Sequence, residues 1–216
     1  MRSIFAATTM FAFLAFAGCG SAGSSQETAV SEPPATALIT EATDWLLDTE
    51  TSTIAFASIK AGELIETHYF PGLTGEISQD GTAAIRIPLD LVETKLELRN
   101  ERMRNMFFKT ETHPTATIRA QVSAQDYADL MVGERRQSEL RGTLSLHGVE
   151  TDVFVDAFVT RIGASRIEIE SSEPAIIYVS DFELEDGLEM LREVAGLPSI
   201  TPAVPVTFSF VFDAQT

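Results

Sequence analysis

The sequence predicts an all-β fold, an antiparallel barrel or sandwich with one or two short helices. From Trp45 onward, apolar residues recur at every second position, which is the period of a half-buried strand. About nine or ten such runs are separated by turn residues, and the strands do not alternate with helices as they would in a parallel sheet. A length of 216 residues suits one domain of this kind.

The last predicted strand has the clearest alternation. Its apolar side chains share one face, with Pro205, Thr207 and Ser209 among the residues between them. The residues of this face are Val204, Val206, Phe208, Phe210 and Phe212. We expect this strand to pair with the first strand, near Trp45, and so to close the sheet.

Tight turns connect the other predicted strands. Asp80-Gly81 is a favoured hairpin dipeptide between the runs at 76–77 and 85–87. The segment 147–150 joins two alternating runs at 142–146 and 151–159. Further extended runs lie at 54–60, 65–70, 115–122, 166–170 and 175–179.

Two helices are expected to interrupt the strands. One covers 97–107 and the other 185–195, where Gly196 and Pro198 end the helical pattern. The sequence shows no internal repeat and no second domain.

Residues 1–18 have the features of a signal peptide. Arg2 precedes an uncharged apolar run at 4–17, which is too short for a stable transmembrane helix. Ala17-Gly18-Cys19 resembles a bacterial lipobox, which predicts that Cys19 is acylated and becomes the N-terminus. Ordinary cleavage after Ala17 is the alternative, because Ala15-Phe16-Ala17 also fits a small-x-small site.

A flexible tether is expected at 19–42, followed by the barrel domain at 43–216. The tether is rich in Gly, Ser, Ala, Thr and Pro, so it has too little apolar surface to fold. The signal peptide and anchor predict a periplasmic protein held at a membrane. Gly20 after the cysteine, by resemblance to sorted lipoproteins, favours the outer membrane.

Composition excludes several classes of function. Against 15 Lys and Arg there are 32 Asp and Glu, giving a net charge of −17, which argues against a nucleic-acid partner. A single cysteine excludes an intramolecular disulfide and multi-cysteine metal sites. His68, His113 and His147 lack metal-ligand spacing, so we expect neither a metal nor a cofactor. Instead, we expect the His147 ring to stabilise a turn by bonding to backbone.

A basic cluster interrupts this acidic sequence. It consists of Lys95, Arg99, Arg102, Arg104 and Lys109. One interpretation is a cationic rim for a pyrophosphate headgroup, since arginine presents a planar fork of donors. The other is a solvated helix face, balanced by Glu97 and Glu101.

Four sequence blocks occur in a fixed order: Trp45–Asp48 with Ser52–Phe56, Leu91–Thr94 with Arg99–Met103, Phe107-Phe108 with His113–Ile118, and Gly142–Val149. Together they resemble the YceI-like family of lipocalin-like periplasmic proteins that bind polyisoprenoids. Asn100 and Lys109 depart from the family pattern. The resemblance implies an antiparallel lipocalin-like β-barrel of about eight strands, whose apolar interior accepts an isoprenoid or quinone-like lipid.

These observations favour a non-catalytic lipid carrier. The ligand-binding candidates are Phe208, Phe210 and Phe212 on the inner face, with Arg99 and Arg102 at a headgroup; the alternative for each phenylalanine is simple core filling. Two other hypotheses remain: a hydrolase or isomerase that uses His147 or His68 as base, and a solidly packed envelope-stress or interaction module. The sequence also leaves a homodimer open.

Overall fold

The computed structural model describes residues 44–215. The predicted signal peptide, the tether and the acylation at Cys19 lie outside the described residues. Within them, no helix has the length and apolar character needed to cross a membrane.

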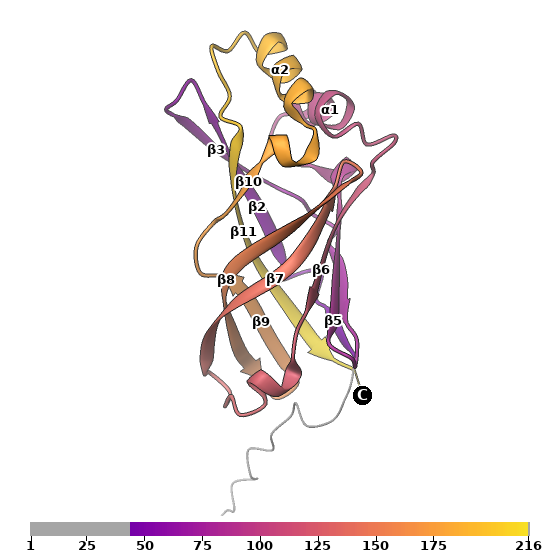
Figure 1. Ribbon diagram of the computed structural model, residues 1–216, viewed down its shortest axis with the longest axis vertical. Coiled ribbons are helices and arrows are strands. Elements are labelled where there is room, and N and C mark those ends of the chain that lie inside the picture. Colours follow the sequence, from indigo (N-terminus) through magenta and orange to yellow (C-terminus); the bar gives the residue numbers. More distant parts are fainter. Residues whose placement is uncertain (1–43, 216) are drawn as a thin grey trace, which may run out of the picture. The chain divides into compact units, whose positions relative to one another are not determined.

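Eleven strands form one antiparallel sheet in the described residues (Figure 1). They are β1 (Trp45–Leu47), β2 (Thr53–Lys60), β3 (Leu64–Tyr69), β4 (Thr74–Ile77), β5 (Thr82–Pro88), β6 (Thr115–Gln121), β7 (Arg135–Leu146), β8 (Val149–Gly163), β9 (Arg166–Ser171), β10 (Ala175–Tyr178) and β11 (Ala203–Ala214).

The predicted helical segments are confirmed, the first of them with a change of helix type. Residues 97–107 form α1 (Glu97–Arg102), which continues as a π-helical turn, η2 (Met103–Phe108). The second segment is α2 (Glu185–Val194). Single turns of 3-10 helix complete the elements: η1 (Leu89–Leu91), η3 (Ala124–Tyr127) and η4 (Val179–Phe182).

The sheet closes into a barrel because β1 pairs with both β4 and β11. The closed ring is β1-β4-β5-β6-β7-β8-β9-β11, eight strands that lie antiparallel to their neighbours. Trp45 lies opposite Ala214, so the predicted closure of first strand to last is confirmed. Closure also decides between the two sheet architectures that the sequence left open, in favour of the barrel.

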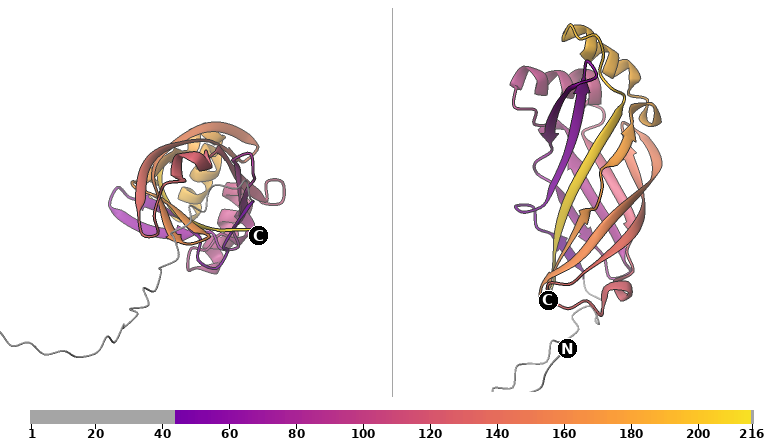
Figure 2. Two further views of the ribbon diagram at one scale, coloured as in Figure 1. Left: turned by 90° about the horizontal axis from the view of Figure 1, so that it is seen from below. Right: turned by 90° about the vertical axis from the view of Figure 1, so that its left-hand side faces the viewer.

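The long strand β11 carries the barrel beyond this ring. Its C-terminal half pairs with β9 and β1, and its N-terminal half pairs with β10 and β2. Strand β3 continues the wall beyond β2. Figures 1 and 2 show α1 and α2 at this extended end, opposite the C-terminus.

The turn between β7 and β8 is shorter than the sequence indicates. Leu146 already pairs with Val149, so His147 and Gly148 alone form the loop. Their φ angles are +53° and +85°, as a two-residue type I′ hairpin requires. The alternation in β7 and β8 therefore continues almost to the turn.

The end of the barrel near the C-terminus is filled by side chains. Trp45, Leu47, Tyr127 and Leu130 are buried there. The buried Arg161 donates a hydrogen bond from Nη1 to the Leu130 carbonyl at 2.8 Å, which satisfies part of its guanidinium. Because side chains fill this end, which we call the floor, the open space inside the barrel lies nearer to the helices.

Candidate ligand cavity

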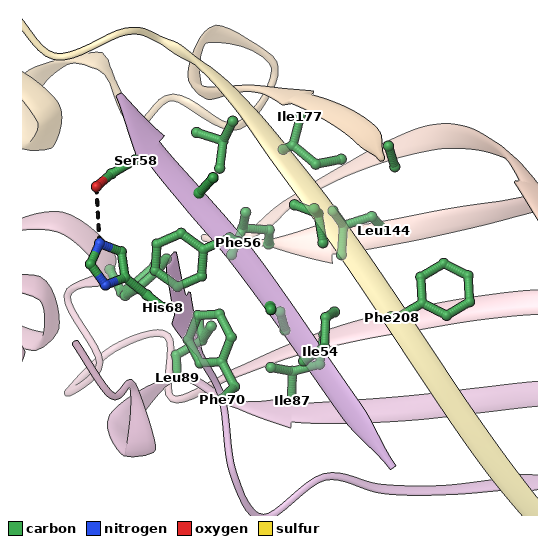
Figure 3. A pocket seen from close by; sticks show the side chains of 18 of the residues that line it. Ile54, Phe56, Ser58, His68, Phe70, Ile87, Leu89, Leu144, Ile177 and Phe208 are labelled. Atoms are coloured by element: carbon green, nitrogen blue, oxygen red, sulfur yellow. Dashed lines mark hydrogen bonds between the residues drawn. The ribbon is translucent and has the colours of Figure 1, made fainter. Parts of the chain in front are cut away.

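The barrel encloses a cavity of about 760 Å³. This lies in the usual range for small-molecule sites, roughly 300–1,000 Å³. Apolar side chains from both sides of the barrel line it, among them Ile54, Phe56, Ile87, Leu144 and Phe208 (Figure 3). A hollow barrel counts against the solidly packed module that the sequence left open.

Strand β11 provides one continuous apolar wall. Every residue of its inner face from Val204 to Phe212 lines the cavity. The Phe208 and Phe210 rings stack with their centroids 4.6 Å apart, and Phe212 is 1% exposed. Because residues 204–212 span about 27 Å of strand, and barrel strands tilt by roughly 40°, this wall covers about 20 Å of the barrel axis.

Helix α2 covers part of the cavity at the end opposite the packed floor, the same end at which α1 lies. Leu184, Leu188, Leu191 and Val194 recur at the three- or four-residue spacing of one helix face, and all four line the cavity. The Gly187 Cα lies so close to η2 that an added Cβ would be 2.9 Å from the Met106 carbonyl oxygen. This close approach holds α2 against η2.

The lining changes from apolar to polar toward α1. Along the inner face of β2, Ile54 and Phe56 are followed by Ser58 and Lys60. On β3, His68 lies opposite Phe56 and Glu66 lies opposite Ser58. The cavity is therefore apolar over most of its length, and most of its polar lining residues lie at the end near α1, which we call the mouth.

Hydrogen bonds and ion pairs connect the polar side chains at the mouth. Ser58 Oγ lies 2.9 Å from His68 Nε2. The Glu66 carboxylate accepts from Lys60 Nζ and, at 2.8 Å, from Arg99 Nη1. These two cations, Lys60 above all, lower the pKa of Glu66.

Buried polar groups fix the start of α1. Asn100 Oδ1 accepts from the Thr94 backbone N–H at 2.8 Å and from Thr94 Oγ1 at 2.6 Å. Arg99 also donates to the Thr94 carbonyl through Nη2. Asn100, a departure from the family pattern, thus positions the helix that carries the two candidate arginines.

The members of the basic cluster differ in their contacts. Arg99 is ion-paired, whereas Arg102 lines the cavity and its guanidinium makes no hydrogen bond or ion pair with residues 44–215. Arg104 pairs with Glu97 at 2.5 Å, and Lys95 and Lys109 are exposed. The cluster is therefore neither a uniform rim nor a purely solvated face.

All five predicted ligand residues line one cavity, although they do not form one contact group. Arg99 and Arg102 lie at the mouth, while Phe212, opposite Leu47, lies near the floor. Ser58 and Glu66 were not among the residues predicted from the sequence. The change from Phe56 to Ser58 and Lys60 along one strand face is the signal that could have identified the mouth.

The three histidines occupy different environments. Burial lowers the pKa of His68 to about 4, and its side chain is 3% exposed. His147 Nδ1 lies 3.2 Å from the Phe182 carbonyl oxygen, so its ring binds the backbone of η4. The centroids of the His113 and His147 rings are 4.5 Å apart. No cluster of three or more metal-ligating side chains occurs in residues 44–215.

A closed antiparallel barrel with a deep apolar cavity and a polar mouth defines the lipocalin-like class of ligand-binding proteins. Within that class, the chain belongs to the YceI-like domain family, whose model matches residues 45–212. A comparison with curated proteins finds no match.

Two solved structures are similar to this chain. One is a polyisoprenoid binding domain from Saccharophagus degradans implicated in plant cell wall breakdown; it is 37% identical, with a TM-score of 0.77, over 79% of this chain and 98% of that domain. The other is BcnA from Burkholderia cenocepacia, 16% identical with a TM-score of 0.60, over 76% of this chain and 98% of BcnA. The likeness to BcnA concerns the fold alone.

Proposed function

We propose that this protein is a non-catalytic carrier that holds the tail of an isoprenoid or similar amphiphilic lipid inside its barrel. The observation that carries this proposal is the apolar cavity that follows β11 from Val204 to Phe212. An elongated hydrocarbon suits such a space, because each methylene moved from water into it contributes about 0.8 kcal/mol. Similarity to the polyisoprenoid binding domain supports this ligand class.

A hydrolase is the alternative favoured by one observation, the 2.9 Å contact between Ser58 Oγ and His68 Nε2. A nucleophilic serine needs a histidine base whose other nitrogen is oriented by a third group. Within residues 44–215, His68 Nδ1 has no hydrogen-bond partner. A pKa of about 4 also makes this imidazole a weak base at neutral pH. These properties favour binding over catalysis.

Native mass spectrometry of the purified barrel tests the carrier function. We expect a co-purified lipid, seen as a mass difference of several hundred daltons that is lost under denaturing conditions. The stacked Phe208 and Phe210 rings and the α2 face would bury its tail. The proposal would be contradicted if the purified protein carried no lipid and also failed to take up added farnesol.

The carrier is proposed to act in the bacterial envelope, anchored through Cys19. The support is the Ala17-Gly18-Cys19 sequence after the apolar run at 4–17. A tether of 24 residues (19–42) would have a root-mean-square length of about 27 Å, enough to separate the barrel from the membrane surface.

Replacing Cys19 with Ser is expected to move the protein from the membrane fraction to the soluble periplasm, or to leave it unprocessed. The measurement is fractionation combined with the intact mass of the mature chain. A wild-type protein that is already soluble and begins at Gly18 would instead establish ordinary signal-peptidase cleavage.

A further inference from the structure

The cavity opens to solvent through an apolar rim at the mouth. Four large apolar side chains of the described residues both line the cavity and are exposed, so they lie where the cavity meets the surface. They come from the β2–β3 hairpin, the start of α1 and the end of α2, which lie at one end of the barrel (Figure 1). This rim consists of Leu64, Leu96, Leu98 and Val194, which are between 43% and 60% exposed.

Direct contacts hold the three parts of the rim together. Arg99 Nη1 of α1 donates to the Glu66 carboxylate of β3 at 2.8 Å. The backbone N–H of Ala61, in the β2–β3 turn, donates at 3.0 Å to the carbonyl of Ser199, which follows α2. Helix α2 also packs closely on η2, the continuation of α1, at Gly187. The rim is therefore one surface and not three independent loops.

The hairpin is apolar on both of its faces near the turn. Leu64 and Ile65 are consecutive in β3, so their side chains point to opposite faces. Leu64 lines the cavity, whereas Ile65 is 64% exposed on the outer face, opposite Ile59. A strand at the surface of an antiparallel sheet normally keeps one polar face toward water. Two exposed apolar faces at one hairpin tip indicate an interaction site for an apolar partner.

Charged side chains near the rim carry both signs. Lys95 and Glu97 alternate with the two rim leucines at the start of α1, and Glu63 precedes Leu64 in the hairpin turn. Arg102 lies one helical turn beyond Leu98. The attraction of this surface for a partner is therefore expected to be apolar, with little dependence on salt.

The described chain begins at the end of the barrel opposite the rim. Strand β1 starts at Trp45, which is buried in the floor. Strand β11 alone covers about 30 Å of the barrel axis. The 24 residues of the predicted tether (19–42) can reach about 80 Å when fully extended. An anchor at Cys19 therefore allows the barrel to turn its rim toward the membrane that holds it.

We propose that the rim docks on the surface of a lipid bilayer, with Leu64, Ile65 and Leu98 entering the interfacial layer. A bilayer is the occupant because the rim surrounds an opening. A rigid protein seated there would close the cavity, whereas a bilayer is an apolar phase continuous with it. The carried tail then passes between bilayer and cavity without exposing its apolar surface to water. This inference rests on the proposed carrier function and adds where the carrier loads and unloads.

Vesicle flotation tests the docking without the acyl anchor. The protein is the complete mature chain, residues 19–216, carrying Cys19→Ser, and the vesicles contain phosphatidylethanolamine and phosphatidylglycerol. We expect the protein to float with the vesicles at low and at high salt. The double variant Ile65→Thr/Leu98→Gln should partition about tenfold or more weakly, because two apolar side chains no longer enter the bilayer.

The matched control makes the same kind of change at the floor end. Met131 and Val132 follow the buried Leu130 and are 58% and 59% exposed, but neither lines the cavity. The double variant Val132→Thr/Met131→Gln should therefore partition like the unsubstituted chain. Ile65→Thr alone, at a position outside the cavity lining, should weaken vesicle binding while farnesol uptake from solution and the melting transition stay unchanged.

A fluorescent label reports which end of the barrel meets the bilayer. Cys19 is the single cysteine of the chain, so Leu98→Cys or Val132→Cys in the Cys19→Ser background gives one labelling site. With the environment-sensitive dye NBD, we expect a blue shift on adding vesicles for the label at 98 and none for the label at 132.

The remaining outcomes separate bilayer docking from the carrier function. Absence of flotation, equal losses in the two double variants, release at high salt, or a blue shift at both labels would overturn docking by the rim. A blue shift at 98 that grows with protein concentration in the absence of vesicles would mean that a second copy covers the rim, and would also overturn it. Farnesol uptake by a protein that ignores vesicles leaves the carrier function intact, whereas vesicle binding by a protein that takes up no farnesol refutes the carrier function.

Discussion

A chain that ends at Pro202 is expected to lose cooperative folding altogether. It lacks β11, which pairs with β9 and β10 on one edge and with β1 and β2 on the other. The truncation would open the barrel and expose two unpaired strand edges. It would also remove the buried Phe210 and Phe212 from the core. Thermal unfolding followed by circular dichroism measures the effect.

The matched control removes a longer segment from the other end of the chain. Deleting residues 1–42, which precede both the barrel and the family match at 45–212, should leave the melting transition in place. A cooperative and unshifted transition in the chain ending at Pro202 would show that β11 is not a structural strand of the barrel.

The strand period predicted this architecture because one face of every barrel strand is buried. The alternation from Val204 to Phe212 is the direct result. The pairing of Trp45 with Ala214 was predicted from that alternation together with the family resemblance at Trp45. The number of strands was harder to predict, since some positions around the barrel are occupied by two short strands in succession. Strands β1 and β2 both pair with β11, separated by a turn in which Asp48 Oδ1 accepts from the Glu50 backbone N–H at 3.0 Å.

The candidate site was predictable only in part. Alternation identified inward-facing phenylalanines, but whether they fill a core or border a cavity depends on the volume enclosed by all the strands together. The role of Arg99 depends on a partner 33 residues away, Glu66, which the cross-strand register brings to the mouth. Local sequence around the basic cluster carries no information about that contact.

Phe210→Asp is expected to abolish lipid retention. Phe210 is 4% exposed, lines the cavity and stacks on Phe208, so a carboxylate at this position would be unpaired in apolar surroundings. Such burial costs several kcal/mol and opposes both the tail and the fold. The control is Thr207→Asp, on the exposed outer face of the same strand, which should retain lipid. Native mass spectrometry and urea unfolding report the two effects separately.

The milder Phe210→Ala variant distinguishes a cavity wall from a packed core. Truncating phenylalanine in a packed core costs about 3–5 kcal/mol, because a new void is sealed inside. Beside an existing cavity of about 760 Å³ the removed ring only enlarges that space, so the free energy of unfolding should fall by less than about 3 kcal/mol. A larger loss in Phe210→Ala would indicate a packed core at this level. A folded Phe210→Asp protein that still retains lipid would show that the tail does not lie against the inner face of β11.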